Sequence, residues 1–324
     1  MSADTPKPIE ILFKQVDGIN IYMDVYLPES ATKEDPAPIV LWWHGGGLLQ
    51  GTRKALSPHH LHAPSKHNIC IVSPDYRLAP QFRFPAILSD CASAMTFLHS
   101  PEFASKVQGR ADTSRIVLSG SSAGGWLSLL CGMGIGFDES GVERPPKIQG
   151  IAAIYPITDL QDEFWKVKKE PYVGYMGRII KREEVEPFVN PDDAESRTAY
   201  SSLDSRRAMF YHYMVQEAIE AELLLGNTRI PETAYSVAPS LKRLLKEPGI
   251  YNLPPTFIVH GTADTKVPVE QARDVAATLE ELKKGGVAVD YEYEEVEGVD
   301  HSYDKEPSCK MERMYEFLNR VFSK

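Results

Sequence analysis

The stretch LSGSSAGG, residues 118–125, decides the fold of this chain. It follows the apolar run RIVLSG (115–120) and opens an apolar, helix-like stretch (123–133). A strand that turns sharply into a helix at G-x-S-x-G leaves the central serine exposed at the strand's end. Gly120 and Gly124 flank Ser122 in that pattern, whereas a pattern centred on Ser121 would need glycine at 119 and 123. Ser122 is therefore the candidate nucleophile, and the alternative is a glycine-rich turn before a core helix.

The sequence around this turn alternates between strand signals and helix signals. Strands covered by helices on both faces read as nearly continuous apolar runs, and half-buried strands alternate apolar with polar residues. Apolar runs occupy 39–43, 69–73, 115–120, 148–156 and 255–261, while 19–27 and 287–298 alternate. Apolar residues at helical spacing mark 84–100, and 269–286 ends in Lys-Lys-Gly-Gly, a helix stop. This rhythm predicts an α/β fold with a mostly parallel sheet.

Residues 160–250 interrupt the rhythm. They contain no convincing strand, and 204–225 places apolar residues on one helical face. We expect a helical insertion over the sheet, because an ordinary crossover helix would need far fewer residues. The insertion is rich in aromatic residues, which either shape a pocket for a bulky or aromatic substrate or pack the insertion against the sheet. They are Phe164, Trp165, Tyr172, Tyr175, Phe188, Tyr200, Phe210, Tyr211 and Tyr213.

A second glycine-rich motif, HGGG (44–47), directly follows the apolar run 39–43. Acyl transfer passes through a tetrahedral oxyanion, which needs N–H donors already aimed at it. Consecutive glycines let backbone amides turn towards one point, and a strand followed by HGGG is the context of an oxyanion hole. Ala123, directly after Ser122, would add a further donor. We expect His44 only to anchor the loop, and a tight turn is the alternative for the motif.

An acid and a base are expected downstream of the serine, in that order. Asp264 follows the run 255–261, and His301 follows the run 287–298. In a parallel sheet these loops open at one edge, so Ser122, Asp264 and His301 can converge. Taken alone, Asp264 could be merely a helix cap, and His301 could be merely a surface histidine. Their joint occurrence in matching contexts favours a catalytic triad.

Composition excludes some classes of partner. The net charge is −10, from 35 basic and 45 acidic residues, without the basic stripe that nucleic-acid binding needs. No window is long and apolar enough to span a membrane, and the N-terminus lacks the apolar core of a signal peptide. The widely spaced cysteines (70, 91, 131 and 309) predict small buried residues in a reducing compartment. We expect a cytoplasmic protein.

The motifs together resemble serine hydrolases of the α/β-hydrolase fold, in the branch related to hormone-sensitive lipase. The matching segments are HGGG (44–47), DYRLAP (75–80), FPA (84–86) with Asp90, GSSAGG (120–125), HGTAD (260–264) and VDHSYD (299–304). The resemblance implies an eight-stranded sheet with helices on both faces and a helical cap. Accordingly, residues 1–159 and 251–324 would form the two parts of the hydrolase core, and 160–250 the cap insertion.

The same resemblance implies a triad of Ser122, Asp264 and His301. It also implies an oxyanion hole built from Gly46 and Gly47, with Gly45 adjacent, and from the amide of Ala123. Three positions depart from the pattern. Ser121 stands where Asp or Thr is usual, Leu48-Leu49 where an aromatic residue follows HGGG, and Gln81 where a glutamate is usual. We expect Leu48-Leu49 to reshape the acyl side of the pocket.

The prediction from the sequence is a cofactor-free serine esterase that acts on a hydrophobic or aromatic small acyl compound. The same triad serves amide and thioester hydrolysis, so those reactions remain alternatives. A non-catalytic binding protein built on the same fold is a further alternative, disfavoured because His301 is present. The sequence does not decide the oligomeric state: the edge strand near 287–296 could pair between subunits, but its acidic residues favour a protected edge.

Overall fold

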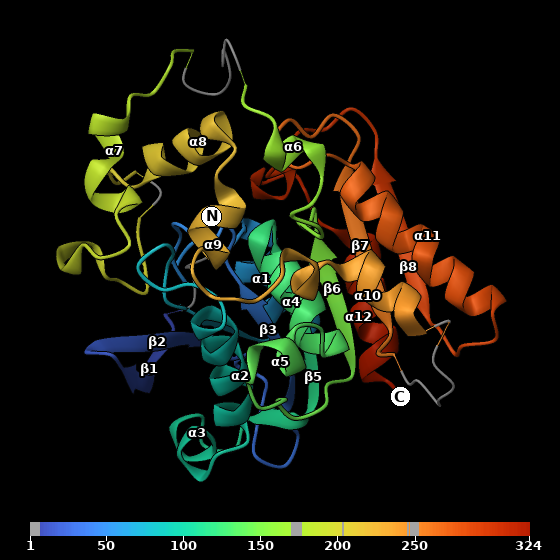
Figure 1. Cartoon of the computed structure of the whole chain (residues 1–324). Coiled ribbons are helices and arrows are strands. Elements are labelled where there is room, and N and C mark those ends of the chain that lie inside the picture. The colour runs from blue at the N-terminus through green and yellow to red at the C-terminus, as the bar shows by residue number, and fades with distance from the viewer. Residues whose placement is uncertain (1–6, 170–176, 203, 245, 247–252) are drawn as a thin grey trace.

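The computed structural model describes residues 7–169, 177–202, 204–244, 246 and 253–324, and one eight-stranded sheet runs through it (Figure 1). The strand order is β1-β2-β4-β3-β5-β6-β7-β8. The β1–β2 and β2–β4 pairs are antiparallel, and all other pairs are parallel. The strands are β1 (Ile9–Val16), β2 (Ile19–Tyr26), β3 (Ala37–Trp43), β4 (Cys70–Pro74), β5 (Ala111–Ser121), β6 (Gly150–Ile154), β7 (Thr256–Gly261) and β8 (Tyr291–Val296).

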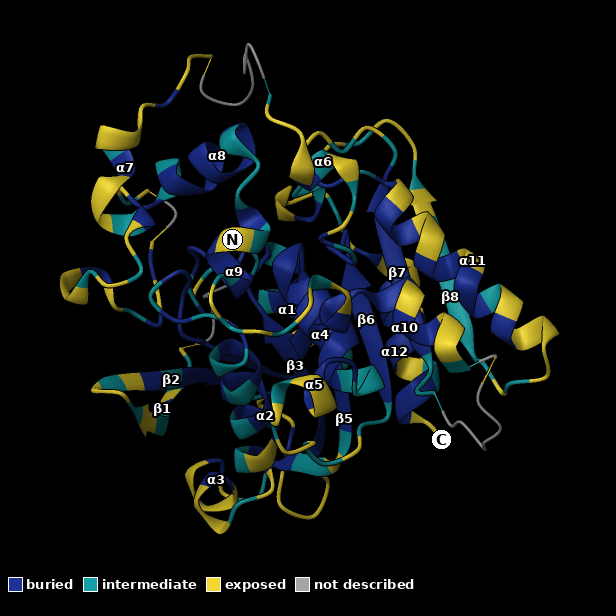
Figure 2. Cartoon of the chain, viewed as in Figure 1, coloured by how far each residue is buried: buried dark blue, intermediate teal, exposed yellow. Residues whose placement is uncertain are grey.

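Helices cover both faces of the sheet, and this explains the unbroken apolar runs. In β3, Ile39 and Leu41 pack into one hydrophobic cluster and Val40 and Trp42 into another on the opposite face. The first cluster includes α2 (Ala86–Leu98), α4 (Ala123–Met133) and α11 (Glu270–Lys284). The second includes α1 (Pro58–His67) and α12 (Glu312–Phe322). Figure 2 shows the central strands buried between these layers. The predicted α/β-hydrolase fold, with a mostly parallel eight-stranded sheet, is confirmed.

Strand β1 was not predicted from its own residues. It pairs with β2 across a tight turn in which Asp17 and Gly18 both have positive φ, 52° and 75°. An Asp-Gly pair in front of an alternating strand is a strong hairpin signal, so the sequence did contain the information. The two shorter helices of the core are α3 (Pro101–Lys106) and α5 (Phe137–Ser140).

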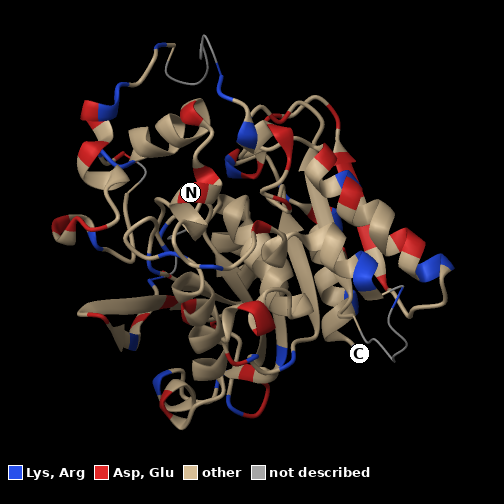
Figure 3. Ribbon diagram, in the orientation of Figure 1, with Lys and Arg blue, Asp and Glu red and all other residues tan. Residues whose placement is uncertain are grey.

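Strand β8 lies at the edge of the sheet, as predicted. Acidic side chains of β8, and Asp290 directly before it, are held by arginines of neighbouring helices. Arg320 of α12 binds Asp290 and Glu292, and Arg273 of α11 binds Glu295. In Figure 3 basic and acidic residues follow one another along α11, while the central strands carry almost no charge. These ion pairs cover the edge with charge, which is one way in which proteins discourage strand pairing between molecules.

The described part of 160–250 is helical, and it lies mainly above the sheet in Figure 1. The prediction of one helical face over 204–225 was wrong, because Ala218 has φ 55° and ends α8. Of the aromatic residues named above, Tyr172 and Tyr175 lie outside the described residues, as does the predicted boundary at 250. The elements are α6 (Glu163–Lys166), α7 (Arg182–Val189), η1 (Ala194–Ser196), α8 (Ala208–Glu217), α9 (Glu220–Leu225), η2 (Glu232–Tyr235) and α10 (Val237–Leu244).

Glu220, the first residue of α9, is fully buried, and neither of its carboxyl oxygens has a hydrogen-bond partner among the described residues. Burial raises its pKa from 4.5 to about 8. The unfolded chain therefore ionises first as pH rises, and folding stability falls between pH 4.5 and pH 8. We expect Glu220→Gln to raise the free energy of unfolding by about 3 kcal/mol at pH 7.

The same substitution should change stability little at pH 4, where the carboxyl is protonated in both states. Urea unfolding of both proteins at several pH values measures the difference. Equal gains at pH 4 and pH 8 would show that ionisation of Glu220 is not the cause.

Candidate active site

Ser122 lies at the turn between β5 and α4, with φ 59° and ψ −122°. Its amide donates a hydrogen bond to the Ile154 carbonyl at 2.9 Å. The turn can form only because its neighbours lack side chains. A Cβ at Gly124 would lie 2.0 Å from the Trp43 carbonyl oxygen, and one at Gly120 would lie 2.2 Å from the Gly124 oxygen. The strained backbone presents the Ser122 side chain beyond the end of the sheet.

Asp264 and His301 come together as the sequence predicted they could. The His301 Nδ1–H donates to Asp264 Oδ2 at 2.7 Å. Asp264 Oδ1 accepts the backbone N–H groups of Lys266 and Val267, both at 2.9 Å. His260 Nε2 lies 3.2 Å from Oδ2, and neither of these two side chains is exposed. Every oxygen of this carboxylate is therefore fixed, and so is the orientation of the His301 ring.

The environment sets the charges of this pair. Burial opposes ionisation of Asp264, but hydrogen bonds from His260 and His301 outweigh it and hold the pKa of the carboxyl below its usual value. Burial lowers the pKa of His301, although the Asp264 carboxylate acts in the opposite direction. At neutral pH Asp264 is ionised and His301 is neutral, as a general base must be.

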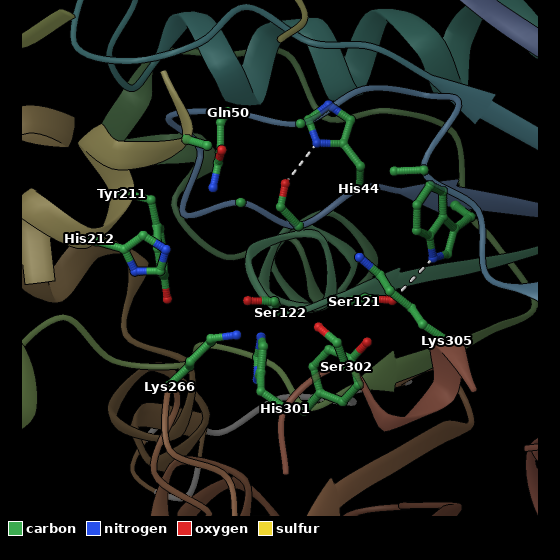
Figure 4. Close-up of a pocket in the computed structure, with 17 residues that line it drawn as sticks. His44, Gln50, Ser121, Ser122, Tyr211, His212, Lys266, His301, Ser302 and Lys305 are labelled. Atoms are coloured by element: carbon green, nitrogen blue, oxygen red, sulfur yellow. Dashed lines mark hydrogen bonds between the residues drawn. The ribbon is translucent and has the colours of Figure 1, made fainter. Parts of the chain in front are cut away.

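Ser122 and His301 line the same cavity, which holds about 190 Å³ of space. In Figure 4 the Ser122 side chain and the His301 ring face each other there. Asp264 does not line the cavity and contacts it only through its hydrogen bond to His301. The cavity is also lined by Trp42 and Tyr155 of the core and by Tyr211 of α8. The structure therefore brings the three predicted residues to one edge of the sheet.

The HGGG loop borders this cavity. Gly45 and Gly46 line it, and Gly46 has φ 106°. Gly47 does not line it; a Cβ there would lie 2.9 Å from the Tyr211 ring. Among the described residues, the amides of Gly46 and Ala123 have no hydrogen-bond acceptor. Donors beside Ser122 are thus available to a ligand.

His44 anchors this loop, in line with the expectation. Its Nδ1–H donates to the Gly45 carbonyl at 2.8 Å, and its ring stacks on Tyr76 with centroids 4.2 Å apart. The Tyr76 hydroxyl donates to the His44 carbonyl at 2.8 Å. Burial lowers the pKa of His44 to about 4, so the ring is neutral and structural.

A buried group behind His301 was missed by the sequence reasoning. The Tyr155 ring lies 4.5 Å from the His301 ring, centroid to centroid, and its hydroxyl donates to Asp304. Asp304 also accepts from Ser57 at 2.6 Å and contacts His59 at 3.4 Å. Asp304 is the last residue of the motif VDHSYD, but the sequence predicted no role for it, and no pattern in the sequence indicated its partners.

The ligand atoms of His59, His60 and Asp304 lie within 4.8 Å of one another, close enough for a metal ion. However, the two oxygens of Asp304 already accept hydrogen bonds from Ser57 and Tyr155. We interpret the group as a hydrogen-bonded support that fixes Tyr155 against the His301 ring.

The departures from the family pattern have structural explanations. Leu48 and Leu49 are fully buried in the core and do not line the cavity. The expectation that they reshape the pocket was therefore wrong. Gln50 of the same loop lines the cavity instead. The Gln81 amide donates to two carbonyls in and after α7, and its oxygen accepts from Arg207. Ser121 lines the cavity with its hydroxyl 3.4 Å from Trp42 Nε1.

Comparison with known families matches this architecture. The family model described as BD-FAE matches residues 23–191, just over half of the chain, including the HGGG loop and Ser122. The chain belongs to the BD-FAE family. Residues 207–324 match the model described as the prolyl oligopeptidase family, and this part contains Asp264 and His301.

Among curated proteins, the chain is similar to the non-reducing polyketide synthase pkbA of Emericella nidulans, with 26% identity over 99% of this chain. The chain spans only 14% of that synthase's length. An α/β-hydrolase superfamily protein from Enterococcus faecalis superposes with TM-score 0.66 and 19% identity, covering 94% of this chain and 96% of that one. The butyrate-bound esterase Est2 of Thermogutta terrifontis gives TM-score 0.58 and 19% identity, with 99% and 95% covered. These two likenesses show the fold.

Two further expectations concern the burial of the cysteines and the presence of a membrane-spanning helix. Cys70, Cys91 and Cys131 are buried as predicted, whereas Cys309 is half-buried. In the described part of the chain, no helix has the length and apolar character needed to cross a bilayer.

Proposed function

We propose that this protein is a serine hydrolase that cleaves a carboxylic ester through an acyl-enzyme. The observation that carries the proposal is the His301–Asp264 hydrogen bond of 2.7 Å at the wall of a cavity that also contains Ser122. In this proposal Ser122 is the nucleophile, His301 is the base and Asp264 orients the base, as covalent acyl transfer requires.

In the first half-reaction the Ser122 oxygen attacks the ester carbonyl while His301 Nε2 takes the hydroxyl proton. The amides of Gly46 and Ala123, with Gly45 and Gly47 in the same loop, stabilise the oxyanion. His301 then gives its proton to the leaving alcohol as the C–O bond breaks. In the second half-reaction water attacks the acyl group while His301 takes a proton from it. His301 then gives that proton to the Ser122 oxygen as the acyl C–O bond breaks, which releases the acid and restores Ser122. Asp264 keeps Nδ1 protonated and stabilises the imidazolium throughout.

The cavity favours a small acyl substrate flanked by aromatic rings. Its volume of about 190 Å³ is below the range typical of drug-sized ligands. Of the described aromatic residues between 160 and 250, Tyr211 lines it, whereas Phe210 and Tyr213 pack in the core and Tyr200 is 58% exposed. We propose that residues 160–250 form a cap that contributes Tyr211 to substrate binding. We also propose, on the basis of the sequence motifs, that the chain belongs to the hormone-sensitive-lipase-like branch.

A series of 4-nitrophenyl esters from acetate to decanoate tests this proposal, with the matching anilide and thioester in parallel. We expect kcat/KM to peak at short acyl chains and to favour the ester over the anilide. The thioester is included because the chain resembles a segment of polyketide synthases. Cleavage of the anilide alone would overturn the ester assignment, and cleavage of the thioester alone would move it to the thioester.

The acidic limb of the pH profile should report His301. Its pKa is lowered, chiefly by burial, and the neutral ring is the active form. We therefore expect kcat/KM to fall only as the pH drops through a midpoint below 6.5. A profile of kcat/KM from pH 4 to 9 measures this midpoint. A midpoint above 7 would contradict the buried, neutral histidine of the structure.

A further inference from the structure

The charges around the cavity differ in sign from those of the chain. The whole chain carries a net charge of −10. Among the described residues that line the cavity, however, the charged ones are Lys266 and Lys305, and no aspartate or glutamate is present. The Asp264 carboxylate lies behind His301 and is occupied by its hydrogen bonds. The charged side chains in the described part of the cavity lining are therefore both cationic.

Both lysines belong to the loops that deliver the candidate catalytic residues. Lys266 follows Asp264 by two positions in the loop after β7. Lys305 ends the short helix η3 (Tyr303–Lys305), four positions after His301. In Figure 4 their amines approach the cavity from opposite sides of the His301 ring, Lys266 on the side of His212 and Lys305 past Ser121. The folding of the site thus fixes the positions of the two cations.

The two lysines lie close enough to titratable groups of the site to interact with them electrostatically. Partial removal from water lowers the pKa of Lys305, although the Asp304 charge acts in the opposite direction. Burial is the main cause that lowers the pKa of His212 to about 4, and the charge of Lys266 lowers it further. The same charge opposes protonation of His301. His301 must become an imidazolium in the reaction proposed above. A negative group bound beside Lys266 would offset the effect of Lys266 on that imidazolium.

We propose that the substrate carries an anionic group, such as a carboxylate or a phosphate, which Lys266 and Lys305 bind beside the ester that Ser122 attacks. This inference rests on the proposed function and narrows its substrate class. The aromatic rings of the cavity contact the apolar part of the same molecule, and the lysines select for its charge. Charged groups placed in this way act as determinants of specificity.

Matched pairs of esters test the proposal. In the first pair, the 4-nitrophenyl monoester of glutaric acid is compared with its methyl-capped neutral form. In the second, 3-carboxyphenyl acetate is compared with 3-carbamoylphenyl acetate, and 3-acetoxyphenyl phosphate is added to distinguish phosphate from carboxylate. We expect kcat/KM for the anionic member to exceed that of its neutral partner by about tenfold in at least one pair. We also expect this ratio to fall as NaCl is raised.

Variants assign the preference to the two lysines. In the double variant Lys266→Met/Lys305→Met, the ratio of anionic to neutral kcat/KM should fall to about 1, and Lys266→Arg/Lys305→Arg should retain most of it. Lys310, which binds the Pro307 carbonyl outside this cavity, provides the control, and Lys310→Met should leave the ratio unchanged.

A ratio of 1 or less in every pair, or a preference that persists in the double methionine variant, would overturn the anion site. If the neutral esters were still cleaved in that case, the proposed function would stand. Absence of hydrolysis of all esters by a folded protein would overturn the proposed function and the anion site together.

Discussion

Replacing Ser122 with alanine should lower kcat for ester hydrolysis by about 10⁴-fold or more, because removal of the nucleophile leaves only the binding and oxyanion contributions. Among the described residues, the Ser122 side chain makes no hydrogen bond that caps α4. The constraints on this turn come from Gly120 and Gly124. The variant should therefore fold normally. Steady-state kinetics with 4-nitrophenyl acetate, together with a thermal melt, provide the measurement.

Ser121→Ala is the matched control, since it removes the neighbouring hydroxyl from the same turn. The Ser121 hydroxyl contacts Trp42 at 3.4 Å, at the limit of a hydrogen bond. We expect kcat to change by less than about tenfold in this variant. If Ser121→Ala removed activity and Ser122→Ala retained it, the assignment of the nucleophile from the glycine frame would be wrong.

Asp264→Asn should lower kcat by about 10³- to 10⁴-fold through the tautomer of His301. Oδ1 accepts two backbone N–H groups, from Lys266 and Val267. The asparagine oxygen must take that position, so its NH₂ group faces His301 Nδ1. Nδ1 then has to be the acceptor, the proton moves to Nε2, and the ring cannot accept the proton of Ser122.

Asp300→Asn is a matched control in the loop next to His301. Asp300 Oδ1 accepts the N–H groups of Thr265 and His301, and an asparagine oxygen can accept both as well. We therefore expect a loss of less than about tenfold. Equal losses in the two variants would mean that Asp264 contributes loop structure rather than orientation of the base.

Local patterns were sufficient to predict the turn at Ser122 and most of the strands. The glycine frame works through steric contacts within a few residues, and doubly covered strands such as β3 must be apolar on both sides. The approach of His301 to Asp264 could be predicted because both follow parallel strands, β7 and β8, whose ends open at one edge.

Features that depend on packing between distant segments could not be predicted. The support behind His301 joins Ser57 and His59 to Tyr155 and Asp304, and nothing in any one segment indicates the others. The break at Ala218 has no glycine or proline to announce it. Lys266 and Lys305 come together at the cavity only because two separate loops meet there. The net charge of the chain, −10, gave no indication of this pair of cations.

The central claim is that Ser122 is an activated nucleophile, and the most direct test is the intact mass after incubation with a fluorophosphonate probe. The wild-type protein and Ser121→Ala should each gain one adduct, whereas folded Ser122→Ala should gain none. Absence of an adduct on the folded wild-type protein, or an adduct that persists in Ser122→Ala, would contradict the account.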